Sequence, residues 1–279
     1  MTPVTECSYF FGIKVFGKSG HPHGEVVKIP ERIKFGFAIA VFSLFFISCT
    51  TIVRMPEISS IPLQAVVVKT PGWNASGASL QRYERKDGPM PWIAVGDKIP
   101  AVVGRNGLGW GTGVHPRSFR EGPVKREGDG KAPAGVFLLR HAFGYTPVEE
   151  ASWIKLPYRQ AMSHIQCVED TRSLYYNKLV DTTKVERSWQ GYEDMRRKDD
   201  QYRLGVVVEH NTDPIIPGDG SCIFIHIWEG PSRGTSGCTG VEAHHMEELL
   251  RWLDPDAMPV LVQMPEPEYV RFRSAWRLP

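Results

Sequence analysis

Residues 222–253 read CIFIHIWEGPSRGTSGCTGVEAHHMEELLRWL, and they predict a strand, a glycine-rich loop and a helix in that order. In residues 222–228 the side chains alternate, so Cys222, Phe224 and His226 share one face while three isoleucines share the other. We expect the isoleucine face to be buried in the core and His226 to project away from it.

The second half of this stretch has the periodicity of a helix. Apolar residues recur at helical spacing over residues 241–253, and they form one stripe. Thr239 and Glu242 have the spacing of a capping box. The sequence therefore predicts a helix over residues 241–253, with Cys238 just before its cap.

Short apolar runs continue on both sides of this segment. They lie at residues 63–68, 92–103, 134–139, 204–209 and 260–264, and Gly96-Asp97 divides the second run into two short strands. The chain also has 27 glycines and 22 prolines, which favours many turns. This pattern predicts a mostly β fold, a sandwich or barrel with a few helices.

Charge and local composition give further limits. The chain has 33 basic and 31 acidic residues, a formal charge of +2, so no strong field favours nucleic acid as a partner. The charged residues 192–202 are expected to form a surface helix.

The N-terminal part reads as a targeting segment. Arg32 and Lys34 precede an apolar run, residues 35–47, that is shorter than a membrane span and has the length of a signal-peptide core. Residues 31–49 resemble a signal peptide that ends in a bacterial lipobox, with Cys49 as the lipidated residue. The alternatives are a plain signal peptide and an uncleaved membrane anchor, and each of them implies export to the periplasm.

The remaining boundaries follow from composition. Residues 1–30 fit either a disordered extension or a misassigned translation start, and residues 50–60 look like a linker. Residues 61–264 are expected to form one domain, with residues 265–279 as a C-terminal tail.

Cys238 and His226 are the candidates for chemistry. A helix N-terminus presents free N–H groups and a partial positive charge, and both would stabilise the thiolate of Cys238. A nucleophile needs a base, and His226 lies twelve residues upstream. The alternative is an inert buried thiol beside a structural histidine.

Three stretches resemble one family, the L,D-transpeptidase catalytic domain, or YkuD-like proteins. The first is His226 followed by Thr235-Ser236-Gly237-Cys238. The second is residues 125–137, KREGDGKAPAGVF, and the third is residues 176–181, YNKLVD. The family fold is mostly β, in agreement with the strand pattern.

The resemblance implies a role for each matching residue. Cys238 is the nucleophile, and His226 is its base, held by the main-chain carbonyl of Ile227. Thr235 supports the site with its hydroxyl, and the N–H groups of Gly237 and Cys238 are candidates for an oxyanion hole. Two positions depart from the family pattern. Ser236 stands where many members have a second histidine, and Gly240 where many have arginine or asparagine.

The implied reaction is acyl transfer on peptidoglycan stem peptides, with no metal or organic cofactor. An amine of another stem as acceptor gives a cross-link, water makes the enzyme an L,D-carboxypeptidase, and a protein amine makes it an anchoring enzyme. An alternative of a different class is a non-catalytic lipoprotein that binds peptidoglycan.

Three further expectations concern side chains outside the pair. Cys167 and Cys222 either form a disulfide, as an oxidising compartment allows, or remain two separate buried thiols. The adjacent His244 and His245 should point apart as surface or packing residues, because neighbours on a helix do not share a face. In the motif of residues 125–137, the acidic side chains are expected to shape a turn.

Overall fold

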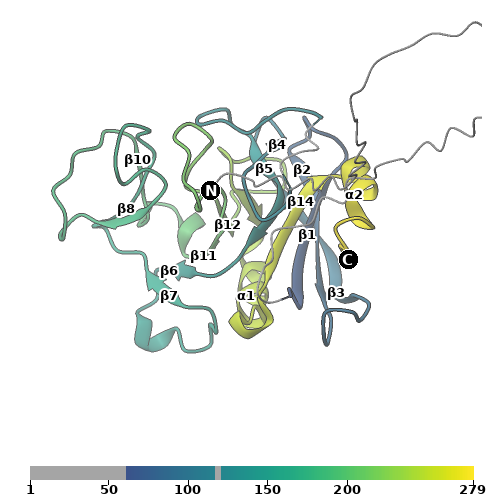
Figure 1. The fold of residues 1–279 in the computed structure, drawn as a ribbon. Coiled ribbons are helices and arrows are strands. Elements are labelled where there is room, and N and C mark those ends of the chain that lie inside the picture. Colours follow the sequence, from purple (N-terminus) through teal and green to yellow (C-terminus); the bar gives the residue numbers. More distant parts are fainter. Residues whose placement is uncertain (1–60, 117–120) are drawn as a thin grey trace, which may run out of the picture. The chain divides into compact units, whose positions relative to one another are not determined.

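The computed structural model describes residues 61–116 and 121–279, which form a mostly β fold in two sheets (Figure 1). The main sheet has eleven strands in the order β4-β5-β14-β1-β2-β3-β13-β12-β11-β6-β7. The first seven of these in chain order are β1 (Gln64–Thr70), β2 (Gly77–Glu84), β3 (Ile93–Val102), β4 (Leu108–Trp110), β5 (Ala132–Leu138), β6 (Ala142–Gly144) and β7 (Tyr158–Gln160). The other four are β11 (Leu204–Val207), β12 (Phe224–Ile227), β13 (Thr239–Val241) and β14 (Val260–Pro265).

A second, three-stranded sheet has the order β10-β8-β9, and we call it the small sheet. Its strands are β8 (Ile165–Val168), β9 (Leu179–Asp181) and β10 (Tyr192–Asp194). Figure 1 shows β8 and β10 on the side of the described residues away from α2.

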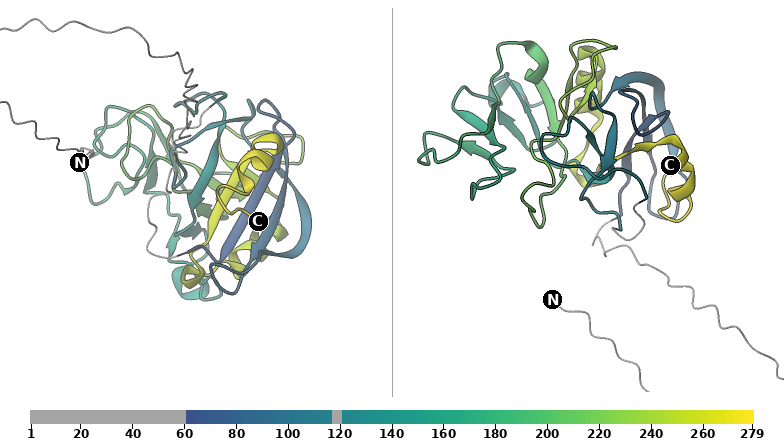
Figure 2. Two further views of the ribbon diagram at one scale, coloured as in Figure 1. Left: turned by 45° about the vertical axis from the view of Figure 1, so that its right-hand side comes forward. Right: turned by 90° about the horizontal axis from the view of Figure 1, so that it is seen from above.

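Two α-helices pack against the main sheet. Helix α1 (Ala243–Trp252) contacts β11 and β12, and α2 (Glu266–Arg273) contacts β14 and β1. Figure 2 shows α2, in yellow, lying over strands of the main sheet. Three short 3₁₀ turns complete the elements: η1 (Val148–Glu150), η2 (Asp200–Tyr202) and η3 (Pro255–Ala257).

The core lies around β1 and β14, which pair in parallel with Val66 opposite Leu261. Every residue of β14 is buried, and so is nearly every residue of β1. Both strands are rich in valine, whose branched side chain packs well on a pleated surface. The expected fold class is therefore confirmed.

The residues expected to form two strands between 92 and 103 form one instead. Strand β3 runs through Gly96, and its pairing with β2 shifts register between Leu80 and Arg82. Gly96 has φ of 66°, so it absorbs the irregularity without ending the strand.

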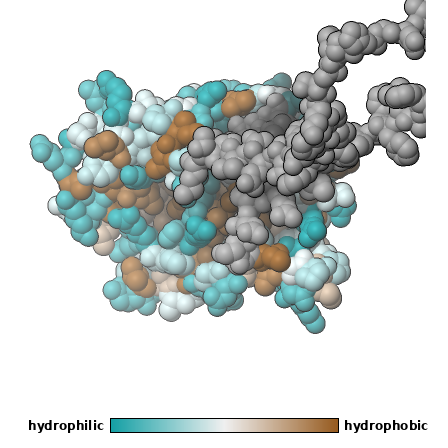
Figure 3. Space-filling model, viewed as in Figure 1, coloured by the Kyte–Doolittle hydropathy of each residue, from teal (hydrophilic) through white to brown (hydrophobic). Residues whose placement is uncertain are grey.

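The last residues belong to the packed structure. Tyr269 and Phe272 of α2 are buried in the main core, together with Trp276. Figure 3 shows apolar residues interspersed among polar ones on the described part of the face it presents. Within the described ranges, no helix has the length and apolar character needed to cross a bilayer.

Candidate active site

Strand β12 carries His226, and its alternation matches the expected pattern. Ile223, Ile225 and Ile227 belong to the main core, whereas Phe224 faces a second apolar cluster. His226 lies on the Phe224 side and lines a cavity of about 520 Å³. The strand thus separates a structural face from a face that borders the cavity.

Cys238 lines the same cavity and directly precedes a short strand, and the predicted helix cap at Thr239 is wrong. Thr239 begins β13, which pairs in parallel with β12 and puts Thr239 opposite Ile225. Helix α1 begins only at Ala243, after Glu242, whose side chain makes no capping hydrogen bond. Sheet pairing therefore overrides the local capping signal.

Thr239 has a different partner from the one expected. Its Oγ1 donates to Oε1 of Gln263 at 2.7 Å, and Nε2 of Gln263 donates to the carbonyl of Pro133 at 2.9 Å. Thr239 and Gln263 are completely buried. The hydroxyl therefore ties β13 to β14 and has no part in a helix cap.

Two backbone groups hold the thiol of Cys238. The N–H of Phe224 donates to Sγ at 3.3 Å, and Sγ lies 3.5 Å from the carbonyl oxygen of Cys222. Burial raises the pKa of the Cys238 thiol well above its ordinary value, and the charge of Glu193 adds to this. The resting group is a neutral thiol, contrary to the thiolate expected at a helix N-terminus.

His226 is held in one orientation by the backbone. Its Nδ1 lies 2.8 Å from the carbonyl oxygen of Ile227. A carbonyl can only accept, so Nδ1 carries the proton and Nε2 keeps the lone pair of a base. Burial lowers the pKa of His226 to about 4, although the bond to Ile227 opposes the shift. The imidazole is neutral near pH 7 and can accept a proton.

Thr235 stabilises the turn that ends at Cys238. Its Oγ1 donates to the carbonyl of Cys238 at 2.6 Å and accepts from the N–H of Gly237 at 3.1 Å. The N–H of Gly237 is thus engaged inside the turn, whereas the N–H of Cys238 has no acceptor among the described residues. Of the two candidate oxyanion donors, Cys238 is the one left available.

The two departures from the family pattern have different surroundings, and Ser236 is the one that lies beside Arg105. Its Nη1 donates to Oγ of Ser236 at 3.2 Å. A Cβ on Gly240 would come within 2.9 Å of Trp228 and 3.0 Å of Val102, so β13 has no room for a side chain there. The cation at this edge of the cavity is therefore Arg105, which no sequence motif marks.

The small sheet closes another side of the cavity, and a disulfide joins it to the residue that precedes Ile223 and β12. Cys167 in β8 is bonded to Cys222, which directly precedes Ile223 and β12. Cys167 lies opposite Glu193 in β10, and Glu193 lines the cavity. The structure thus contains the disulfide, and with it two walls of the cavity are covalently connected.

The surface helix expected over residues 192–202 is wrong. This stretch forms β10 and η2, and it brings Glu193, Arg197 and Tyr202 to the cavity. Arg197 donates to Glu193 at 3.1 Å, and the buried Tyr202 packs edge-on against the His226 ring at 5.1 Å between centroids. These residues carry no motif, and their charge pattern alone gave no sign of the site.

The other two quoted motifs also converge here. Glu127 accepts from the hydroxyls of Tyr176 and Ser221 at 2.5 and 2.7 Å. Asn177 accepts from the N–H of Cys222 at 2.9 Å. Asp129 accepts from the backbone N–H groups of Arg126 and Lys131 and so shapes the turn, as expected. The separated motifs form one hydrogen-bonded frame around the thiol.

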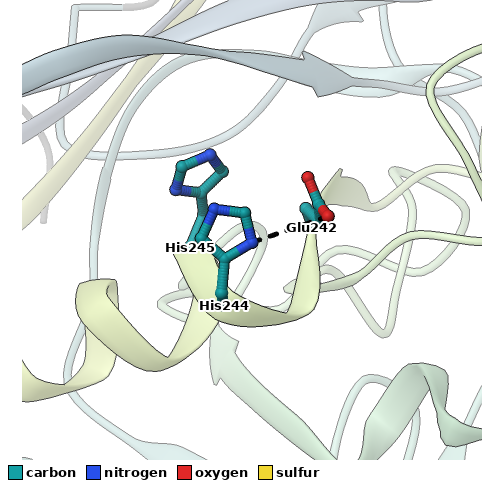
Figure 4. Close-up of side chains that lie close together, drawn as sticks. All are labelled: Glu242, His244 and His245. Atoms are coloured by element: carbon teal, nitrogen blue, oxygen red, sulfur yellow. Dashed lines mark ion pairs between the residues drawn. The ribbon is translucent and has the colours of Figure 1, made fainter.

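A cluster of side chains of the kinds that bind metal ions lies at the start of α1, away from the cavity (Figure 4). The rings of His244 and His245 approach to 3.7 Å, so the expectation that they point apart is wrong. Their ligand atoms and those of Glu242 lie within 4.8 Å of one another. The positive end of the helix disfavours a cation there, and none of the three lines the active-site cavity.

Comparison with known proteins agrees with this geometry. The sequence profile of the YkuD family, the L,D-transpeptidase catalytic domain, matches residues 90–262, well over half of the chain. No curated protein and no solved structure matches the chain. The matched range contains β12 with His226, the turn of residues 235–238 and the small sheet. The chain therefore belongs to the L,D-transpeptidase catalytic domain family.

Proposed function

We propose that this protein is a peptidoglycan L,D-transpeptidase that works through a cysteine acyl-enzyme, with Cys238 as nucleophile and His226 as base. The observation that carries the proposal is that Cys238 and His226 line one cavity: His226 lies in β12, and Cys238 directly precedes β13, the parallel neighbour of β12. The family as a whole acts on peptidoglycan peptides, which supports a stem peptide as the substrate.

The first half-reaction starts from the neutral pair. Nε2 of His226 takes the thiol proton as Sγ of Cys238 attacks the carbonyl carbon between an L- and a D-centre of the stem. The N–H of Cys238 is placed to donate to the oxyanion that forms. The carbon–nitrogen bond then breaks, and the imidazolium of His226 gives its proton to the leaving amine. A terminal D-residue departs, and a thioester remains.

The second half-reaction passes the acyl group to an amine of another stem and restores the thiol. Water as acceptor would give a trimmed stem, and a protein amine would give an anchored protein. Mass spectrometry of the products from purified protein and stem tetrapeptides distinguishes the three. The proposal of a transpeptidase predicts cross-linked dimers as the main product.

The pair itself is tested by substitution. Cys238→Ala should abolish turnover, and His226→Ala should lower it about 10²- to 10⁴-fold because base catalysis is lost. The double variant should be little worse than Cys238→Ala, since the two residues act as a unit. A carbapenem should add its mass to the wild-type protein and not to Cys238→Ala.

Two outcomes would count against this function. Substantial turnover by Cys238→Ala would exclude the thiol as nucleophile. A wild-type protein that neither turns over nor is acylated would favour the non-catalytic peptidoglycan-binding lipoprotein instead.

We further propose that the enzyme works in the periplasm, anchored by a lipid on Cys49. Cys49 lies outside the described residues, and the order of basic, apolar and small residues before it supports the proposal.

A further inference from the structure

Four glutamates line the active-site cavity, and one of them has no partner. Glu127 accepts from Tyr176 and Ser221, Glu193 accepts from Arg197, and Glu229 pairs with Arg233 at 3.4 Å. The carboxylate of Glu169 makes no hydrogen bond or ion pair within the described ranges. It is therefore the one acidic group in the cavity that the fold leaves without a structural task.

The position of Glu169 is nevertheless fixed. It directly follows β8, and its backbone N–H donates to the carbonyl of Gly191 at 3.0 Å. Two residues before it, Cys167 is bonded to Cys222. The small sheet thus holds Glu169 on the wall of the cavity that contains Cys238, and its side chain is only partly buried.

The surroundings of Glu169 favour a cationic ligand. Burial raises the pKa of Glu169 to about 7, and the nearby charges of Glu193 and Glu127 add to this while Lys125 opposes it. A partly dehydrated carboxylate beside two others gains most from a positive charge. The proposed reaction brings one such group to this cavity, the ammonium group of the acyl acceptor.

We propose that Glu169 binds the ammonium group of the acceptor and takes one of its protons as the amine attacks the thioester. This inference rests on the proposed function and adds a second proton acceptor to it. A carboxylate whose pKa lies near 7 is a stronger base than one with an ordinary pKa, so it takes a proton from the ammonium group more readily.

The acceptor enters as R–NH₃⁺, and one proton moves to the carboxylate of Glu169. The amine nitrogen then bonds to the thioester carbon, and the carbon–sulfur bond to Cys238 breaks. The second proton passes through Nε2 of His226 to the departing sulfur. The products are the amide, the thiol and protonated Glu169, which returns its proton to solvent.

The test measures how the acyl-enzyme divides between amine and water. Full-length protein is incubated with a stem tetrapeptide as donor and glycine amide as added acceptor, and both products are quantified by mass spectrometry. In Glu169→Gln the ratio of aminolysis to hydrolysis should fall about tenfold or more, within the usual effect of a base. Glu169→Asp should recover part of the ratio. Glu186→Gln removes the same charge from an exposed position outside the cavity and should leave the ratio unchanged.

The pH profile provides an independent readout. Glu169 is a carboxylate above about pH 7, so the wild-type ratio should rise with pH through this value. Glu169→Gln should lose this rise and keep only the one caused by deprotonation of the free amine. An unchanged ratio and profile in Glu169→Gln, with acyl-enzyme still formed, would overturn the inference while the proposed function stands. Absence of acyl-enzyme in the wild type would remove both.

Discussion

At the scale of single residues, the candidate site rests as a neutral thiol and a neutral imidazole that line the same cavity. The pKa of Cys238 is raised by burial, and the pKa of His226 is lowered to about 4 by burial as well. Both shifts disfavour the charged forms. Charge on Cys238 and His226 therefore develops only when the substrate is attacked, and the two residues need not form an ion pair with each other before the substrate arrives.

This resting state makes a prediction for alkylation. Iodoacetamide should label Cys238 more slowly at pH 7 than it labels a cysteine in an unfolded peptide, because the reagent needs the thiolate. As pH rises, the thiol loses its proton only above its raised pKa, so the labelling rate should still be climbing beyond pH 9. Peptide mapping of the segment that contains Cys238 gives the rate, and a plateau below pH 8 would contradict the neutral state.

At the scale of elements, substitution of Thr239 tests what holds β13 in place after Cys238. Thr239→Val keeps the shape of the side chain but leaves the buried Oε1 of Gln263 without its donor. An unsatisfied buried acceptor costs about 1–3 kcal/mol, so the free energy of unfolding should fall by that amount. Thr239→Ser keeps the hydroxyl and is the control.

The same variant distinguishes the strand from the helix cap. In Thr239→Val, the amides in the first turn of α1 should lose no more protection from hydrogen exchange than the rest of the domain. The reason is that the helix begins at Ala243 and Thr239 does not cap it. Selective fraying of the first turn of α1 would instead indicate that Thr239 acts as a cap.

The disulfide is a second device at this scale. It closes a loop of 55 residues between Cys167 in β8 and Cys222 beside β12. Replacing both cysteines with serine should lower the free energy of unfolding by about 2–4 kcal/mol, because the unfolded chain gains freedom. Acylation by stem peptide should fall too, since the small sheet carries a wall of the cavity. Denaturant unfolding without reductant measures the loss of stability. Equal free energies of unfolding for the wild type and the double serine variant would argue against it.

At the scale of the whole molecule, the proposed anchor is open to direct measurement. Mass spectrometry of the mature protein should find an N-terminal lipidated Cys49, with residues 1–48 removed. Cys49→Ser should lose the lipid and leave the membrane fraction. Cleavage at another site, or an intact residue 1, would contradict the lipoprotein proposal.

Much of the fold could be predicted from local patterns in the sequence, and the family resemblance predicted that Cys238 and His226 share one site. The alternation of β12 places the isoleucines in the core, and the His226–Ile227 contact lies within one strand. The start of α1 could not be predicted, because a local capping signal at Thr239 competes with pairing to a strand that the sequence does not reveal as its neighbour.

The residues that surround Cys238 and His226 could not be predicted from the sequence either, because their places depend on contacts between distant parts of the chain. Arg197 and Tyr202 lie in a charged stretch that looks like a surface helix, and their partners in the cavity come from other elements. Glu169 and Arg105 have no motif around them. Such side chains become recognisable only once the chain's long-range contacts are known.

The apolar cluster next to the cavity contains three cysteines, Cys167, Cys222 and Cys238. In the unfolded chain, Cys222 and Cys238 are 16 residues apart, whereas Cys167 and Cys222 are 55 apart. Loop closure favours the nearer pair by about 1 kcal/mol, and that pairing would block Cys238, the proposed nucleophile. If the protein is oxidised during export, the yield of active enzyme depends on the relative rates of folding and of disulfide formation. The small sheet must dock on β12 before oxidation, or a disulfide isomerase must repair the wrong link afterwards.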